Sequence, residues 1–289
     1  MTQFLHVSHL KVTGANVLSA SWLVSPAQVI PALMFSHNMG RRTGFSPTGV
    51  AIVHHDYNLV GEWFGGRFGS CQRTEIGAGV SGNKVRGPSQ PTILADMELS
   101  LYIEFEGNPP SESALKKFFE GGIRFSGGTA QIRKPNSGYR QIVEGVKKES
   151  GFWIIDRTDL VDPKQPLNSI VNNIGFKNFN KGKDSWLCPA VLAHVMAEGP
   201  IGTGREDYPQ YYGEPCVGLV QYISVHEYKD FCSSQTELSN RTTPILWWGI
   251  IPVWRMNWNE VPDLDENPVK FFFVTQSLTP IKRNGDLNV

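Results

Sequence analysis

The sequence predicts an α+β fold built around the element order strand, helix, strand, strand, helix, strand. Two observations carry this prediction. Apolar and polar residues alternate through residues 95–107, which is typical of a strand with one buried and one solvated face. Residues 25–40 and 109–122 carry the start and stop signals of helices. The order βαββαβ is that of the ferredoxin-like unit, which RNA recognition motifs share.

The first strand and the first helix lie at the N-terminal end. The stretch FLHVSHLKVTG, residues 4–14, mixes two alternations but suits a short strand. Ser25 is then a suitable N-cap for a helix, and Gly40 is its stop signal. Because Pro31 lies one turn further in, a helix start at Ile30 remains the alternative.

Three more elements and a C-terminal extension follow. The run GVAIVHHDYNL predicts the second strand, and a Gly-, Ser- and Arg-rich excursion at residues 65–90 predicts a flexible insertion before the third. Ser111 or Ser113 caps the second helix, and glycines end it before a last extended segment. Further apolar extended segments make residues 150–289 a β-rich extension. No Pro/Ser linker divides the chain, so we predict a single domain over residues 1–289.

A glycine-rich stretch, GGIRFSGGT at residues 121–129, has from Gly122 the spacing of a phosphate-binding P-loop, with Gly128 in the lysine position. A P-loop needs a strand before it and a helix after it, and here the predicted order is reversed, which excludes a nucleotide site. The glycines instead predict a helix end and a bulge or close backbone approach in a strand. Nearby cations leave open whether the approaching backbone is a polyanion or the protein itself: Arg124, Arg133, Lys134 and Arg140.

Composition excludes several classes of site. Lysine plus arginine and aspartate plus glutamate number 27 each, so any nucleic-acid site is a local patch. The four cysteines form no CxxC pair, and no cofactor or metal site is predicted. The adjacent His54 and His55 point to opposite faces of a strand and cannot share a metal. No leader or membrane-spanning apolar run is evident, and we expect a cytoplasmic protein without a membrane partner.

Six stretches resemble, in order, the motifs of the handle-binding subunit of type I-F CRISPR surveillance complexes, the second of the four Csy-complex proteins. They are HLKVTGANVLSASWLVSPAQVIPALMFSH, GVAIVHHDYNL, TILADMELSLYIEFEG, GGIRFSGGTAQI, GFWIIDRTDL and WLCPAVLAHVMAEGPIG. The family's first-helix motif is kept here only at Pro26 and Ala27. With its divergent C-terminal part, the chain resembles a phage, mobile-element or variant-system member.

The resemblance implies an RNA-binding assembly protein without catalytic activity. The family has an RNA-recognition-motif core with an inserted β-hairpin thumb, for which residues 65–90 are the candidate here. Its members hold the 5′ handle of the guide RNA. They pair with the large subunit of the surveillance complex and contact the adjacent backbone subunit. Target DNA is then recognised indirectly, by base pairing with the guide.

Ten residues are the candidate RNA contacts. Short polar side chains and an aromatic ring after the first strand suit splayed bases, and cations suit phosphates. The candidates are Asn16, Ser19, Ser21, Trp22, Arg41, Arg42, Arg124, Gln131, Arg133 and Lys134.

Two other functions remain open. The alternative is a metal-independent endoribonuclease acting on repeat RNA, with a histidine as general acid or base; its candidates are His9, His37, His54 and His55. A protein-interaction module without RNA contact is the third. The tryptophan-rich stretch WWGIIPVWRMNW is expected to be exposed and to favour a protein partner.

Overall fold

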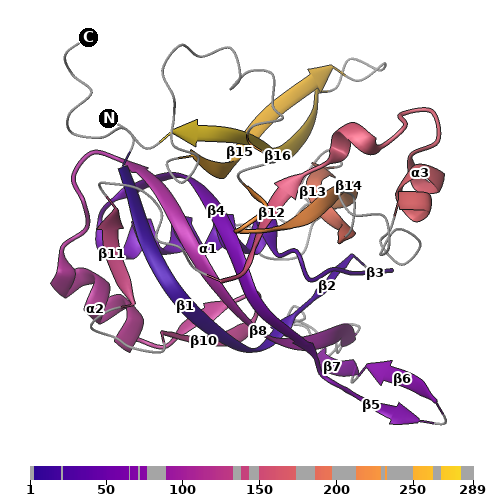
Figure 1. Ribbon diagram of the computed structural model, residues 1–289, viewed down its shortest axis with the longest axis horizontal. Coiled ribbons are helices and arrows are strands. Elements are labelled where there is room, and N and C mark those ends of the chain that lie inside the picture. Colours follow the sequence, from indigo (N-terminus) through magenta and orange to yellow (C-terminus); the bar gives the residue numbers. More distant parts are fainter. Residues whose placement is uncertain are drawn as a thin grey trace, which may run out of the picture.

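The computed structural model describes residues 3–20, 22–64, 66–70, 72–76, 89–132, 138–142, 150–173, 186–196, 213–228, 232, 250–262 and 268–280 (Figure 1). The first half contains β1 (Gln3–Asn16), β2 (Leu18–Ala20), β3 (Leu23–Val24), α1 (Val29–Thr43), β4 (Ser46–Leu59), β5 (Gly61–Phe64), β6 (Arg67–Ser70), β7 (Gln72–Ile76), β8 (Ser89–Glu106), α2 (Glu112–Glu120), β9 (Ile123–Phe125), β10 (Gly128–Ile132) and β11 (Tyr139–Ile142). The second half contains β12 (Phe152–Asp156), the 3₁₀ turn η1 (Thr158–Leu160), α3 (Pro166–Asn173), β13 (Leu187–Met196), β14 (Gly213–Ser224), β15 (Ile250–Pro262) and β16 (Pro268–Pro280).

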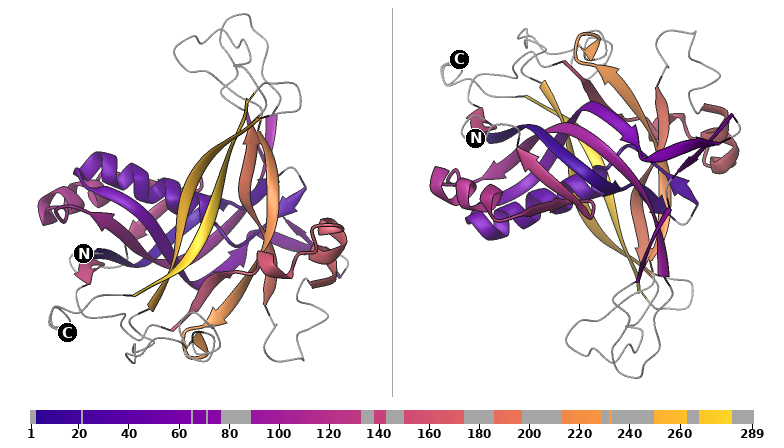
Figure 2. Two further views of the ribbon diagram at one scale, coloured as in Figure 1. Left: turned by 90° about the horizontal axis from the view of Figure 1, so that it is seen from above. Right: turned by 90° about the horizontal axis from the view of Figure 1, so that it is seen from below.

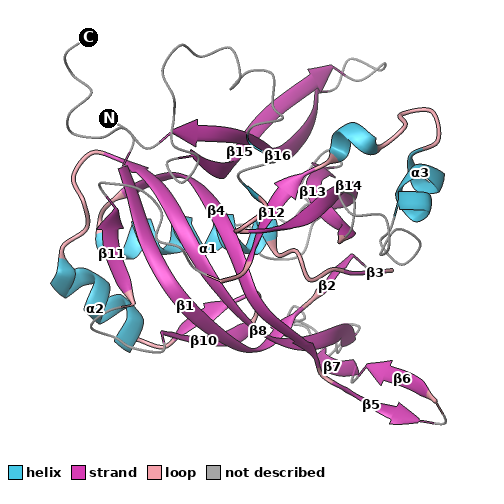
Figure 3. Cartoon of the chain, in the orientation of Figure 1, coloured by secondary structure: helices cyan, strands magenta, loops and turns pink. Residues whose placement is uncertain are grey.

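One antiparallel sheet of twelve strands dominates the described residues (Figure 3). Ten of its strands follow the order β12-β14-β13-β16-β15-β4-β8-β1-β10-β9, while β11 pairs with β1 and β7 pairs with β8. One edge of β4 pairs with β8, and β4 also pairs with β12 and, at Val50, with Trp254 of β15. The six strands β4, β12, β14, β13, β16 and β15 therefore form a closed ring, from which β8, β1, β10 and β9 continue the sheet.

The predicted fold class, a ferredoxin-like core with added strands, is wrong. The six predicted elements occur in the predicted order, but their strands do not form a small separate core. They are part of the ten-strand path, because β4 joins strands from both halves of the chain. Alternating apolar residues predict that a segment is a strand but not which distant strand it pairs with, and the ring depends on such pairings.

The candidate thumb, residues 65–90, is described in part. β5 and β6 form a separate two-stranded hairpin, and β7 pairs with β8 from Gln72↔Ile93 to Ile76↔Ser89. Residues 77–88 lie outside the described residues. The strands β12 to β16, from the predicted C-terminal extension, all belong to the large sheet.

The first helix differs from its prediction at both ends. α1 begins at Val29, after Gln28 as N-cap, so the predicted cap at Ser25 is wrong. Its C-cap is Gly44, in the left-handed conformation at φ 83°, and Gly40 lies inside the helix. A Cβ at Gly40 would lie 2.5 Å from Pro47 Cδ, so this glycine allows the start of β4 to approach the helix. In α2, Ser111 is the cap, because its hydroxyl accepts a hydrogen bond from the Ala114 amide.

Two hydrophobic clusters cover opposite faces of the sheet. The larger one joins α1 and α2 to residues such as Leu99 and Leu101 of β8. The smaller one covers the other face with residues from both halves of the chain, including Tyr102, Trp153 and Ile251. α1 and α2 lie together at one side of the molecule and α3 lies at the other (Figure 2). Among the described residues, the smaller cluster buries the face opposite the helices around Tyr102, whereas Lys11, Arg124 and Gln131 are exposed on that face. We call this exposed part the open face.

The tryptophan-rich stretch is not exposed at the one tryptophan that can be placed in it. Trp254 is fully buried in the larger cluster, and its indole nitrogen donates a hydrogen bond to the Ile154 carbonyl at 3.2 Å. Trp247 and Trp248 lie outside the described residues. Trp254 is thus part of the core and offers no surface to a partner.

Candidate functional site

The glycines at the end of GGIRFSGGT allow a tight turn and a close approach between two strands of the sheet. Ser126 and Gly127, at φ 47° and 79°, form the turn between β9 and β10, where a two-residue hairpin needs left-handed residues. A Cβ at Gly128 would lie 2.7 Å from the Ala15 amide nitrogen and 2.8 Å from the Thr13 carbonyl oxygen. The backbone that comes close is therefore that of β1. Because a strand follows these glycines, the exclusion of a P-loop is confirmed.

Replacing Gly128 with alanine is expected to lower the free energy of unfolding by about 2 kcal/mol, because β1 backbone atoms must move to admit the methyl group. Thr129→Ala, at an exposed position of the same strand, is the matched control and is expected to change it by less than about 0.5 kcal/mol. Urea denaturation of both variants measures the difference. Equal stability of the two variants would contradict the steric role of Gly128.

The first group of predicted RNA contacts lies where β1 ends. The Asn16 side chain accepts a hydrogen bond from the Leu18 amide, and its backbone exchanges hydrogen bonds with Ser126. Ser19 lies in β2, and Trp22, 60% exposed, lies in the turn to β3. Ser21 lies outside the described residues. Asn16 therefore shapes the turn, whereas Trp22 is free to contact a ligand.

The second group lies at the opposite end of α1. Ser126, which donates to the Asn16 carbonyl, also contacts Gln28, the N-cap of α1, so Asn16 lies near the start of this helix. Arg41 and Arg42 are in its last turn, and because the helix spans about 22 Å, they do not share a site with Asn16. The Arg42 guanidinium lies over the Phe118 ring at 5.1 Å from its centroid. This cation–π contact ties α1 to α2.

The third group lies on the open face of the sheet. Arg124 of β9 and Gln131 of β10 are exposed on the face opposite the helices. Lys11 of β1, which sequence reasoning did not select, is exposed on the same face directly opposite Gln131. Arg133 and Lys134 lie outside the described residues. The structure thus brings together Arg124 and Gln131 and adds Lys11, but it separates them from the other two groups.

Next to Lys11, two β-bulges bring two histidines together. The register of β1 against β8 shifts between Val7 and Leu10, and that of β4 against β8 shifts between His54 and Asp56. His9 and His55 lie in these shifts, on opposite sides of β8, and their rings stack with centroids 4.4 Å apart. Bulges reorient side chains and are frequent beside active sites. His9 also has φ 51°, which is rare for a residue with a side chain.

Hydrogen bonds assign the protons of both rings. Nδ1 of His9 lies 2.5 Å from Glu98 Oε1, and an ionised carboxylate only accepts, so Nδ1 carries the proton and Nε2 presents its lone pair. Nδ1 of His55 lies 2.5 Å from the Ser150 carbonyl oxygen and therefore donates to it. Nε2 of His55 then accepts from the Ser100 hydroxyl at 2.7 Å, while Ser100 Oγ accepts from the His9 amide. Both nitrogens of His55 are thus engaged, whereas His9, with 40% of its side chain exposed, can act on a ligand.

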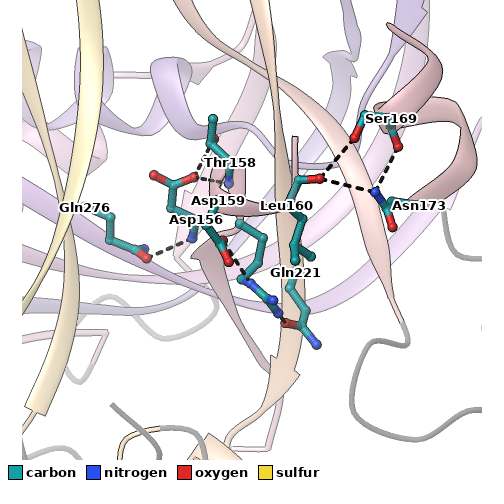
Figure 4. Close-up of polar contacts among 9 residues, drawn as sticks. Asp156, Thr158, Asp159, Leu160, Ser169, Asn173, Gln221 and Gln276 are labelled. Atoms are coloured by element: carbon teal, nitrogen blue, oxygen red, sulfur yellow. Dashed lines mark hydrogen bonds and ion pairs between the residues drawn. The ribbon is translucent and has the colours of Figure 1, made fainter. Parts of the chain in front are cut away.

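The stretch GFWIIDRTDL has a structural role. Asp156 accepts hydrogen bonds from the amide and the hydroxyl of Thr158, and the Arg157 guanidinium donates to Gln221 of β14 (Figure 4). The Leu160 carbonyl accepts from the side chains of Ser169 and Asn173. These contacts fasten η1 and α3 to the sheet.

Two of the other candidate histidines are placed away from this face. His54 is buried on the helix side of β4, opposite to His55, as the alternation predicts. His37 is exposed on α1. Within the described ranges, no group of three or more His, Cys, Asp or Glu side chains is arranged to hold a metal ion, and no helix is long and apolar enough to cross a membrane.

Comparison with known proteins adds no assignment. The chain matches no protein-family model and no curated protein.

Proposed function

We propose that this chain binds RNA through the open face of its sheet, as the subunit of a type I-F CRISPR surveillance complex that holds the 5′ handle of the guide RNA. In this role it pairs with the large subunit and contacts the adjacent backbone subunit, in the cytoplasm. The order of the six sequence stretches that resemble the handle-binding family supports this role. The observation that carries the proposal is the placement of Lys11, Gln131 and Arg124 on three neighbouring strands of one open face.

This face has the groups that RNA requires. Arginine and lysine neutralise phosphates, while an amide such as Gln131 both donates to and accepts from base edges. The two nearby carboxylates are held in place by hydrogen bonds, Glu98 to His9 and Asp96 to the Gly14 amide at 2.8 Å, so the phosphate contacts are left to Lys11 and Arg124. With no net charge on the chain, such a patch is the local site that binding demands.

Charge reversal on the open face tests the proposal. We expect the double variant Lys11→Glu/Arg124→Glu to bind single-stranded RNA at least tenfold more weakly in a filter-binding titration. The slope of log affinity against log salt concentration should become shallower by about 1.4, since two phosphate contacts are lost. The matched control is Lys116→Glu/Lys117→Glu, which makes the same charge change on exposed positions of α2.

The control pair is expected to change the affinity less than threefold. Equal loss in both double variants would indicate attraction by overall charge alone and would contradict this binding face. A competition between guide RNA with and without its 5′ handle then tests the finer role. Equal affinity for the two RNAs would exclude handle recognition.

A further inference from the structure

We propose that His9 is a general base with which this protein cleaves single-stranded RNA without a metal ion. The inference rests on the proposed RNA binding and departs from the resemblance, which implies no catalytic activity. The sequence leaves four histidines as candidates for such a nuclease, and the structure selects one of them. The reactive atom is Nε2 of His9, which points its lone pair away from the Nδ1–Glu98 contact.

Three features prepare His9 for this role. Glu98 fixes the ring tautomer so that Nε2 is the basic atom, in the arrangement by which a carboxylate orients a catalytic histidine. His55 stacks on the ring and is itself held at both nitrogens, so it is a positioning residue and not a second base. The left-handed backbone of His9 is costly for a residue with a side chain, and such strain is concentrated at functional sites.

The other three candidates lack this arrangement. His54 is buried, with 5% of its surface exposed. His37 lies on α1, away from the open face. The ring nitrogens of His55 are occupied by Ser100 and the Ser150 carbonyl.

The reaction is an attack of the ribose on its own phosphate. Nε2 of His9 takes the proton of a 2′-hydroxyl, and the 2′-oxygen forms a bond to the adjacent phosphorus. The bond from phosphorus to the 5′-oxygen breaks, and that oxygen takes a proton from water. The products are a 2′,3′-cyclic phosphate and a 5′-hydroxyl, and the imidazolium returns its proton to solvent.

The neighbouring cations suit this step. Lys11 lies two residues from His9 and is the Cα partner of Glu98 across the strand pair, so its exposed side chain extends from the same face as Glu98. A positive charge there stabilises the additional negative charge of the pentavalent phosphorus. Gln131 and Arg124, one and two strands away from β1, would hold the flanking nucleotides.

The test is a cleavage assay with a labelled single-stranded RNA of mixed sequence in EDTA, run in parallel with a binding titration of the same RNA. We expect the full-length protein to cut the RNA and to leave 2′,3′-cyclic phosphate ends. The same sequence with 2′-deoxyribose should stay intact. His9→Gly, which suits the left-handed backbone, should lose about 100-fold or more in rate and keep its RNA affinity within threefold.

Two further variants separate chemistry from structure. Free imidazole should restore part of the activity of His9→Gly, which it could not do for a misfolded site. Glu98→Gln should slow cleavage and leave the RNA affinity within threefold, because a neutral amide stabilises the imidazolium formed at His9 less well than the carboxylate does. His37→Gln, on exposed helix surface, should cut as fast as the unmodified protein.

The outcomes distinguish this inference from the proposed function. RNA that binds and stays intact overturns the inference and leaves the binding role standing. Absence of RNA binding overturns the proposed function, and the inference with it. Cleavage that EDTA abolishes, or that persists in His9→Gly, excludes His9 as the base.

Discussion

Arg255→Leu is expected to lower the free energy of unfolding by about 3 to 5 kcal/mol, because it leaves the Glu104 carboxylate buried without its partner. The Arg255 guanidinium donates to both carboxylate oxygens of Glu104, at 2.6 and 3.0 Å, and also to Ser277 and Thr279 of β16. The Thr48 hydroxyl of β4 donates to the same carboxylate. The ion pair thus joins β8 and β4 from the first half of the chain to β15 and β16 from the second.

A second variant identifies the cause of this loss. Glu104→Gln/Arg255→Leu removes both charges and should recover part of the stability that Arg255→Leu loses, measured by urea denaturation. Lys116→Leu is the matched control, because its pair with Glu120 is exposed at both ends and should contribute less than about 1 kcal/mol. If Arg255→Leu cost no more than this control, the buried pair would not hold the two halves together.

The protein is expected to lose about 2 kcal/mol of stability between pH 7.5 and pH 5 through His54 alone. The pKa of His54 is lowered from 6.5 to about 4, mainly by burial and to a smaller extent by the electrostatic influence of His55, whereas Asp56 opposes the shift. Since the unfolded chain takes up the proton first, stability is complete above pH 6.5 and decreases as the pH falls toward 4. The full loss is about 3 kcal/mol.

The neighbours of His54 do not offset this cost. The rings of Tyr57 and Tyr222 lie 6.1 and 5.6 Å away, and burial raises the pKa of Tyr57 to about 12, so that it stays neutral. Within the described residues, Nε2 of His54 has no hydrogen-bond partner. An incoming proton at Nε2 would therefore be poorly solvated.

Denaturation curves at several pH values check this effect. His54→Phe should lack the loss between pH 7.5 and pH 5, whatever its stability at neutral pH. His37→Gln should retain the loss, because position 37 is exposed on α1. The same pH dependence in all three proteins would show that His54 is not its source.

The strand faces on which His9 and His55 lie could have been predicted from the spacing of the apolar residues around them. In β1, the residues that face the helices are Leu5, Val7, Leu10 and Val12. The step of three residues from Val7 to Leu10, instead of two, indicates one extra residue in the strand. A strict two-residue period instead puts His9 in line with Leu5 and Val7, on the wrong face. A single step of three is thus the sequence signal of a bulge.

β4, the second strand predicted from the sequence, carries the same signal. Its residues on the helix side continue to His54 and resume at Tyr57, so His55 is the extra residue. The stacking of His9 on His55 could not have been predicted from spacing, since it requires that both strands flank β8. That arrangement depends on long-range pairing, as the ring of six strands also does.

Other elements followed from local chemistry alone. Ser111 and the glycines after residue 120 gave α2 its ends because capping is decided by a few neighbouring atoms. The prediction that Gly40 ends the first helix was wrong because glycine also occurs where another segment packs closely, which in this case is Pro47. The approaching segment is not visible in the local pattern.

Closure of the ring has a consequence for how the chain folds. The contact between Val50 and Trp254 joins residues about 200 positions apart, and such non-local pairing slows folding because a long loop must close first. During synthesis, the edge of β4 that later contacts β15 is made long before its partner leaves the ribosome. Until then, the N-terminal half presents an unpaired strand edge, and the time spent in that state sets its exposure to aggregation.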